Sequence, residues 1–386
     1  MLLCALLILA PLLQEDVQEE ELAGCRRCDY RGVTDCKDHG KELLAMEQEV
    51  LFCSEAVQCE TCGGSLLVPC KRCDGGPETK QRESRLAAIR KWQQRDKPVD
   101  VHLKRSLLHL EIPQFQLIFD VPELRNGKKK IRGHEFAHLL ARDLNQLFEL
   151  FCQDFGCELK DFRGPERMWF WGRAEDHRSV MTRFLFSTSA GDFKMLGKNP
   201  VFSVHTHDSA FQGSVDAIHS LGLHNAAHLL LSNLDVEMWV GDRRGGWFDA
   251  GVAHAYEEAL LGSSTNYCID EATMTPNYEN GRWELALAKR LKKEEQAFIP
   301  AMLPQQTGTL TEEQHAMAWS VVDWIRHQHP EILRPMLNGF QKGRSTRDLF
   351  RDTLSLEIYQ VEQLWRDWVA AEYPKRAKQK KSRKRR

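Results

Sequence analysis

The chain has 386 residues, of which 42% are hydrophobic, and its formal net charge is −2. This length can supply a sizeable core and a small appendage, so we expect two or three domains. The charge is uneven, because residues 375–386 hold nine Lys or Arg while the rest of the chain has 55 acidic against 44 basic residues. That basic tail has no aromatic residue, which excludes sequence-specific reading of nucleic acid by the tail.

The N-terminus begins with an unbroken apolar run at residues 2–13. Twelve residues are too few for a comfortable membrane span, but they fit the apolar region of a signal peptide. No Lys or Arg precedes the run, and the lipoprotein-like box at residues 22–25 lies too far from it. We interpret residues 1–20 as a signal peptide or apolar N-terminal segment and expect an exported or membrane-associated protein of a periplasm or cell envelope. A cytoplasmic location stays an open alternative.

Two cysteine-rich units of identical spacing occupy the next segment, residues 21–76. They are Cys25-x2-Cys28-x7-Cys36-x2-His39 and Cys59-x2-Cys62-x7-Cys70-x2-Cys73. Each C-x-x-C turn can present two sulfur ligands, and two such turns complete a tetrahedral zinc site. Since His39 cannot form a disulfide but can bind zinc, we expect zinc rather than the disulfide framework that an exported chain would permit. The spacing leaves open whether each unit binds its own ion or the units exchange turns.

The stretch CETCGGSLLVPCKRCDGG resembles the cysteine-rich zinc region of DnaJ-type chaperones, whose unit is CxxCxGxG. The likeness covers about residues 25–76, and Tyr30 and Leu66 stand where that unit has glycines. No J-domain signature accompanies it. The resemblance implies a small zinc-ribbon-like module that binds zinc and contacts a protein or peptide, without implying chaperone activity.

The remaining chain shows strand patterns first and helix patterns afterwards. Residues 77–100 are strongly charged and predict a linker or a solvated helix. Strands are predicted within residues 107–121, with a break at Pro113, and at 201–207, while residues 168–186 fit strand and helix pieces. Helices are predicted at residues 134–155, 311–328, 345–352 and 357–371.

We therefore expect an α+β body over residues 101–373, with a mixed sheet followed by a helical C-terminal half. Thr311 and Gln314 form a capping box that marks the start of one C-terminal helix. Residues 374–386 predict a disordered tail that is solvated or touches an anionic surface.

The first histidine pair belongs to the sequence HEFAH, His134 to His138, a literal HExxH. In that motif two histidines on one helix face hold zinc, and the Glu polarises a bound water. A helical projection puts Phe136 on an apolar stripe, His138 roughly opposite that stripe and His134 near its edge. We interpret HEFAH as a chance match on an exposed polar face, with a zinc peptidase site as the alternative.

The second pair, His224 and His228, lies in a predicted helix that is apolar on nearly all sides. Both side chains should therefore be buried, where they need hydrogen bonds or a metal.

The segment WFDAGVAHAYE, Trp247 to Glu257, resembles the W-L-x-E-G-x-A-x-Y-x-E segment of gluzincin metallopeptidases, in the peptidase MA-like group. The resemblance implies a gluzincin-like fold over about residues 100–370. His224 and His228 match the two histidine ligands of that family, but Asn225 stands at the general-base Glu and Ala250 at the third-ligand Glu.

Both replacements imply a catalytically dead domain, because an amide cannot take a proton from metal-bound water and alanine supplies no ligand. Asp249, His254 or Glu257 are candidates to replace the missing ligand. A further pair, His205 and His207, is expected at a strand end near a cleft. Cys152 and Cys157 are expected either to pair or to be core thiols.

The leading hypothesis is a zinc-binding, non-catalytic, gluzincin-like protein with a binding or scaffolding role. The expected zinc ligands are Cys25, Cys28, Cys36, His39, Cys59, Cys62, Cys70 and Cys73, with a second set formed by His224, His228 and His254. No catalytic residue and no small-molecule cofactor are expected. The alternatives are an active zinc-dependent peptidase and a chaperone-like or thiol-redox module that acts through the CxxC pairs. The oligomeric state stays open.

Overall fold

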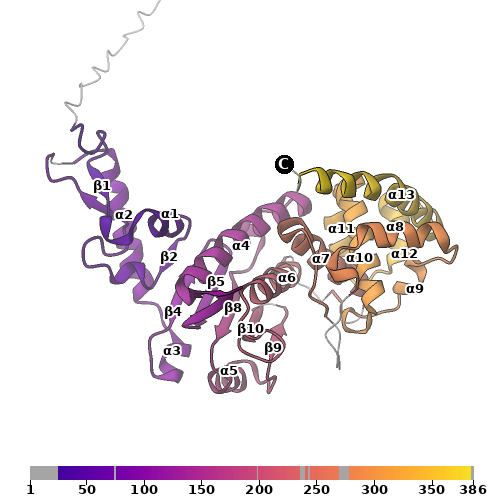
Figure 1. Cartoon of the computed structure of the whole chain (residues 1–386), viewed down its shortest axis with the longest axis horizontal. Coiled ribbons are helices and arrows are strands. Elements are labelled where there is room, and N and C mark those ends of the chain that lie inside the picture. The colour runs from indigo at the N-terminus through magenta and orange to yellow at the C-terminus, as the bar shows by residue number, and fades with distance from the viewer. Residues whose placement is uncertain are drawn as a thin grey trace, which may run out of the picture.

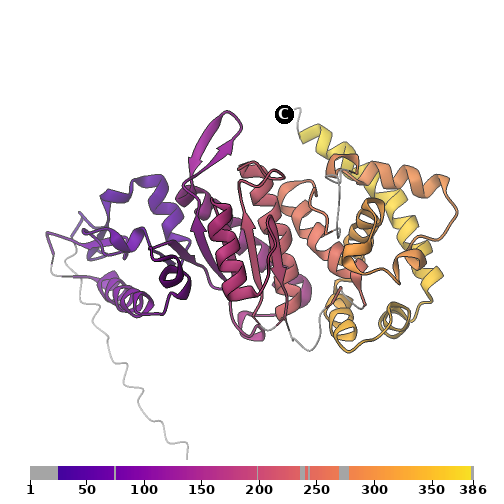
Figure 2. The same cartoon turned by 90° about the horizontal axis from the view of Figure 1, so that it is seen from below.

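The computed structural model describes residues 25–73, 75–197, 199–234, 240–241, 244–268 and 278–383. The predicted N-terminal apolar segment lies outside these residues. Figures 1 and 2 show an elongated molecule, with the cysteine-rich segment at one end, a mixed sheet in the middle and the C-terminal helices at the other end. Within the described ranges, no helix combines the length and the apolar character needed to cross a membrane.

The strands form one large sheet and two small ones. Their bounds are β1 (Val33–Asp35), β2 (Phe52–Cys53), β3 (Leu67–Pro69), β4 (Leu108–Glu111), β5 (Phe115–Asp120), β6 (Glu123–Asn126), β7 (Lys129–Arg132), β8 (Glu166–Trp171), β9 (Asp192–Met195) and β10 (Val201–His205). The large sheet has the order β2-β4-β5-β8-β10-β9, in which β5, β8 and β10 are parallel and the other pairs are antiparallel. The expected mixed sheet is therefore confirmed.

The helices dominate the second half of the chain, as predicted. Their bounds are α1 (Lys41–Gln48), α2 (Pro77–Gln93), α3 (Pro98–Leu103), α4 (Gly133–Phe155), α5 (Ala174–Val180), α6 (Val215–Asn233), α7 (Gly246–Leu261), α8 (Glu284–Lys293), α9 (Ile299–Met302), α10 (Glu312–Gln328), α11 (Leu333–Gln341), α12 (Thr346–Leu354) and α13 (Ile358–Arg383). The capping box at the start of α10 is present, because the Gln314 amide donates to Thr311 Oγ1 and the Thr311 amide donates to Gln314 Oε1.

Alternation along the central strands gives the sheet two apolar faces. Phe119 of β5 and Phe170 of β8 stack at 4.4 Å between ring centroids in the main core, which also contains side chains of α4 and α6. Trp169 and Trp171 point to the opposite face and belong to a second cluster with Val180 of α5. Because successive side chains of a strand alternate between faces, one sheet can support helices on both sides.

The cysteine-rich segment joins the body through the sheet. Its strand β2 pairs with β4, which places Cys53 opposite Leu110. The charged residues expected to form a linker or solvated helix fold as α2, whose Trp92 is buried and stacks on Phe52 at 5.2 Å. The segment is therefore attached by pairing and packing as well as by chain connectivity.

Helix α13 continues to Arg383, so the predicted tail is helical as far as that residue, and residues 384–386 lie outside the described residues. Tyr373 is buried and its hydroxyl donates to Ser320 Oγ, 2.7 Å away. Arg376 donates to Asp323 Oδ2 at 2.7 Å and lies 4.9 Å from the centre of the Trp368 ring. These contacts extend the helix past Pro374, which a composition argument could not foresee.

Candidate metal centres

The two cysteine-rich units exchange their turns. Cys25 and Cys28 meet Cys70 and Cys73, with Sγ–Sγ distances of 3.8 Å (Cys25 to Cys70) and 3.7 Å (Cys28 to Cys73). A tetrahedral ion with zinc–sulfur bonds of about 2.3 Å separates its sulfurs by about 3.8 Å, whereas a disulfide needs about 2.05 Å. This outer group therefore has the dimensions of a metal site.

The inner group consists of Cys36, His39, Cys59 and Cys62. The Sγ atoms of Cys36 and Cys59 lie 3.8 Å apart, and His39 Nε2 lies 3.2 Å from Cys62 Sγ. His39 Nδ1 lies 2.6 Å from Glu47 Oε2, which orients the ring so that Nε2 faces the sulfurs. The eight expected ligands thus form two complete tetrads, and all cysteines of the described residues are free thiols.

Two non-glycine residues of the cysteine-rich units have left-handed backbone angles. Tyr30 has φ 64° and Leu66 has φ 65°, both left-handed, at the positions where the DnaJ-type unit has glycines. True glycines remain where the units approach each other: a Cβ on Gly32 would lie 2.1 Å from the Gly76 nitrogen. The turn geometry is therefore preserved, at a cost in strain at Tyr30 and Leu66.

The HEFAH pair is not on an exposed face, and that interpretation was wrong. His134 and His138 are 5% and 2% exposed, and their Nε2 atoms lie 3.0 Å apart. They form a group with Glu47 of α1 and Cys53 of β2, both also buried. The projection identified the apolar stripe of α4 correctly, but α1 and β2 cover the other side of the helix. Glu135 itself is exposed.

Burial and neighbouring groups shift the pKa values of the two HEFAH imidazoles in opposite directions. Burial lowers the pKa of His134, but contacts with Cys53 and Glu55 outweigh it and raise that pKa to about 10. Burial, together with the charge of His134, lowers the pKa of His138 to about 4. One imidazole of the pair is therefore charged and the other neutral in the metal-free chain.

The second pair, His224 and His228, is buried in α6 as expected, and Cys268 joins it. The two Nε2 atoms lie 3.2 Å apart, and Cys268 Sγ lies 3.4 Å from His224 Nε2 and 3.3 Å from His228 Nε2. A tetrahedral zinc ion would separate such atoms by roughly 3.4–3.6 Å. The three atoms can therefore share one ion.

Each histidine of this site is held by a buried carboxylate on α7. His224 Nδ1 lies 3.0 Å from Glu257 Oε2, and His228 Nδ1 lies 2.8 Å from Asp249 Oδ1. A carboxylate on the second ring nitrogen fixes the tautomer that presents Nε2 to a metal. Asp249 and Glu257, weighed as substitute ligands, thus position the ligands, and the third ligand atom of the group comes from Cys268.

His254 does not join the His224, His228 and Cys268 group. Its Nδ1 lies 2.7 Å from Ser264 Oγ, and its Nε2 lies 2.8 Å from His315 Nδ1. It also lies near Glu257 and could share an ion with Glu257 and His224 Nδ1. However, Glu257 already accepts hydrogen bonds from Ser264 Oγ and the Thr265 amide, which leaves it little capacity for a metal.

Two acidic groups at the site have lowered pKa values. Burial raises the pKa of Glu257, but hydrogen bonds to His224 and His254 outweigh this and lower it to about 2. Burial also raises the pKa of the Cys268 thiol, but Lys194 and the two histidines move it well below its usual value. Lys194 Nζ lies 3.2 Å from Cys268 Sγ. A thiolate is the form of cysteine that binds metals.

Asn225 and Ala250 occupy the two positions where the gluzincin resemblance would have glutamates, and both are buried. Asn225 is buried and its Nδ2 donates to the Leu221 carbonyl at 2.9 Å. Ala250 is fully buried. The site therefore has metal ligands without a general base at the expected position.

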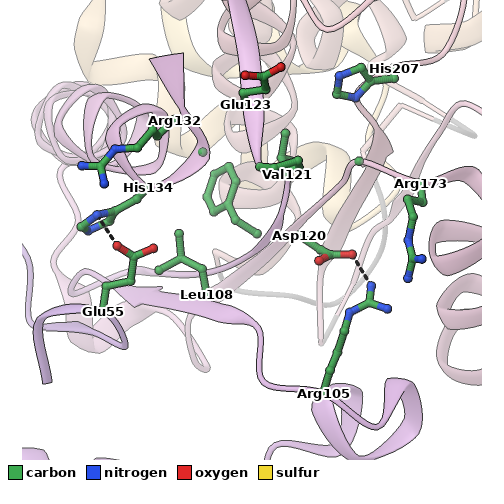
Figure 3. Close-up of a pocket in the computed structure, with 14 residues that line it drawn as sticks. Glu55, Arg105, Leu108, Asp120, Val121, Glu123, Arg132, His134, Arg173 and His207 are labelled. Carbon is green, nitrogen blue, oxygen red and sulfur yellow. Dashed lines mark hydrogen bonds and ion pairs between the residues drawn. The ribbon is translucent and has the colours of Figure 1, made fainter. Parts of the chain in front are cut away.

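One of the two expected strand-end histidines, His207, lines a pocket of about 640 Å³ at the carboxyl ends of β5 and β8 (Figure 3). His207 and His134 line it together with Arg105, Arg132 and Arg173. His205 ends β10. The Sγ atoms of Cys152 and Cys157 lie 3.6 Å apart, and both residues are free thiols, so they do not form a disulfide.

Sequence reasoning missed Glu47, Cys53 and Cys268 as ligand candidates. Cys53 lies between the two cysteine units and belongs to neither, and Cys268, the last of the 12 cysteines, lies outside the WFDAGVAHAYE segment that precedes it. The one available signal was that Cys53 and Cys268 lie outside the repeat, since a cysteine without a partner in its own motif can be a ligand elsewhere. Neither a scan against known protein-family models nor a search of characterised proteins returned a match.

Proposed function

We propose that this chain is a zinc-binding protein whose gluzincin-like body keeps a metal site but binds its partner rather than cleaving it. The observation that carries the proposal is the group of His224, His228 and Cys268 beside Asn225. Three ligand atoms leave one coordination position open, and an amide stands where a hydrolase needs a base.

The order of elements supports the gluzincin resemblance. A mixed sheet precedes α6 with its histidine pair, α7 carries the WFDAGVAHAYE segment beside that pair, and further helices follow. The contacts of His224 with Glu257 and of His228 with Asp249 tie the two helices at the site. In this proposal Cys268 replaces the ligand that Ala250 lost.

In the proposed role, a donor group of a protein or peptide partner occupies the open position of the bound zinc. The cysteine tetrads have no such position, because four protein ligands close each one. In this proposal the tetrads have a structural role: the bound zinc stabilises the fold of the N-terminal segment.

One experiment separates binding from catalysis. The full chain and its His228→Ala variant are purified, their zinc content is measured, and both are incubated with an unfolded protein substrate with and without chelator. We expect His228→Ala to lose one zinc per chain and neither protein to hydrolyse the substrate. His219→Ala, on the same helix but outside the ligand group, should keep all its zinc.

An active zinc peptidase is the second candidate, and the open coordination position favours it. In that case the full chain would cleave the substrate, chelator would stop the cleavage, and His228→Ala would abolish it. Glu135 is not expected to take part, since its side chain is exposed while His134 and His138 are buried. Such a result would overturn the non-catalytic proposal.

A further inference from the structure

A third four-ligand group lies where the cysteine-rich segment meets the body. Glu47 of α1 and Cys53 of β2 come from the segment, and His134 and His138 come from α4 of the body. All four side chains are at most 5% exposed. Cys53 Sγ lies 3.4 Å and Glu47 Oε1 lies 3.7 Å from His134 Nε2.

Hydrogen bonds alone do not satisfy this group. His134 Nδ1 is already 2.7 Å from Glu55 Oε2, and its single remaining nitrogen faces His138, Cys53 and Glu47 together. One ring nitrogen can hold at most one proton, so it cannot bond to three partners. A cation at the centre would satisfy all of them, and the separations resemble the edges of a tetrahedron with metal bonds of about 2.0–2.3 Å.

We propose that Glu47, Cys53, His134 and His138 hold a zinc ion that fastens the cysteine-rich segment to the body. Four protein ligands leave no open position, so the ion is structural. Glu55 is the positioning residue that sets the tautomer of His134.

The carboxylate of Glu47 also links this ion to the inner cysteine tetrad. Its Oε1 faces the proposed ion, while its Oε2 lies 2.6 Å from Nδ1 of the tetrad ligand His39. Filling either site orients the carboxylate for the other. The cysteine-rich segment and the body are thereby joined through one side chain as well as through the pairing of β2 with β4.

The test compares Cys53→Ala with Cys157→Ala in the full chain. Both cysteines are buried, but Cys157 belongs to none of the metal groups found in the described residues. We expect Cys53→Ala to contain one zinc fewer per chain and to exchange the amide hydrogens of α1 and β2 faster, while Cys157→Ala keeps its zinc. Unchanged zinc in Cys53→Ala, or equal loss in both variants, would overturn the proposal.

A second measurement does not depend on the folding of the Cys53 variant. The full chain is loaded with cadmium-113 and studied by NMR, where the chemical shift reports the number of sulfur ligands. We expect two resonances of one-sulfur sites, of which His228→Ala removes one. If no one-sulfur resonance remains in His228→Ala, the third site fails independently of the proposed function. If His228→Ala removes none while one persists, the proposed function fails and the third site stands.

Discussion

At the scale of single residues, the structure shows what stands at the positions where the resembled motifs have glycines or a glutamate ligand. Tyr30 and Leu66 keep left-handed backbone angles without being glycine. Cys268 lies beside His224 and His228, whereas Ala250, at the position where the gluzincin-type segment has a glutamate, offers no ligand atom. Left-handed turns therefore occur without glycine, and a candidate ligand comes from outside the recognised segment.

Tyr30→Gly should stabilise the cysteine-rich segment. A left-handed conformation costs a non-glycine residue about 1–2 kcal/mol, and the greater freedom of glycine in the unfolded chain offsets about 0.5–1 kcal/mol of that gain. Tyr30 is 51% exposed, so little packing is lost. We expect the free energy of unfolding, measured with metal bound, to rise by up to about 1 kcal/mol. Tyr30→Ala keeps a Cβ and should give no such rise; an equal rise would contradict the strain argument.

Glu166→Gln should change the pH dependence of stability. Burial raises the pKa of Glu166 to about 8, although hydrogen bonds from Asn233 and Gln114 act against this. Between about pH 4.5 and 8 the folded state then holds more of this proton than the unfolded chain, so the free energy of unfolding falls as pH rises. Each pH unit in that window lowers the free energy of unfolding by up to about 1.4 kcal/mol.

We therefore expect Glu166→Gln to be more stable than the parent at pH 8.5, by at least about 1 kcal/mol, with the difference shrinking toward pH 5. Urea unfolding at a series of pH values measures this. Glu175→Gln makes the same chemical change at an exposed position and serves as the control. A difference for Glu166→Gln that does not vary with pH would contradict the shifted pKa.

At the scale of elements, the packing of helix pairs positions the group of His224, His228 and Cys268. Helix α7 lies against both α6 and α10, and its Gly251 faces the Ala318 carbonyl of α10. An added Cβ there would lie 2.5 Å from that oxygen and 2.7 Å from Val322 Cγ2. The glycine of the WFDAGVAHAYE segment therefore permits close helix packing that holds Asp249 and Glu257 beside the histidines.

Gly251→Ala should destabilise the body by about 1–3 kcal/mol, because the overpacked Cβ must push α7 from α10. Thermal unfolding of the full chain measures this. Gly164→Ala adds a Cβ where no atom lies within 4 Å and should change stability little. Equal effects of the two substitutions would argue against close helix packing as the cause.

The central strands and the longest helices of the body could be predicted from the sequence, but the short elements and the contacts between distant segments could not. The helix at Gly133–Phe155 and the capped helix at Glu312–Gln328 follow from local periodicity and capping. The burial of His138 depends on α1 and β2, which come about ninety residues earlier and bear no local mark of that contact. A helical projection identifies the apolar face of a helix, but it cannot show that other segments bury the polar face as well.

The candidate sites also differ in how far the sequence could predict them. Spacing identified all eight candidate ligands that cluster in the cysteine tetrads, because the turns that present them are local. The exchange of turns between units and the arrival of Cys268 at α6 are long-range events. Candidate ligands could therefore be predicted where the cysteine repeat supplied them in pairs. They could not be predicted where a distant residue such as Cys53 or Cys268 supplied a single one.

At the scale of the whole molecule, the metal groups follow the long axis of the protein. The two cysteine tetrads lie in the terminal segment, the Glu47 group lies at its junction with the sheet, and the His224 group lies on α6 toward the C-terminal helices (Figure 1). In the proposed arrangement three closed sites build the N-terminal half, and one open site serves binding.

Anomalous diffraction at the zinc edge, from crystals of the full chain grown with zinc, tests this arrangement most directly. We predict a peak at each cysteine tetrad, one among Glu47, Cys53, His134 and His138, and one among His224, His228 and Cys268. The last of these is central to the proposed function. Peaks at the tetrads with none beside His224 and His228 would contradict it.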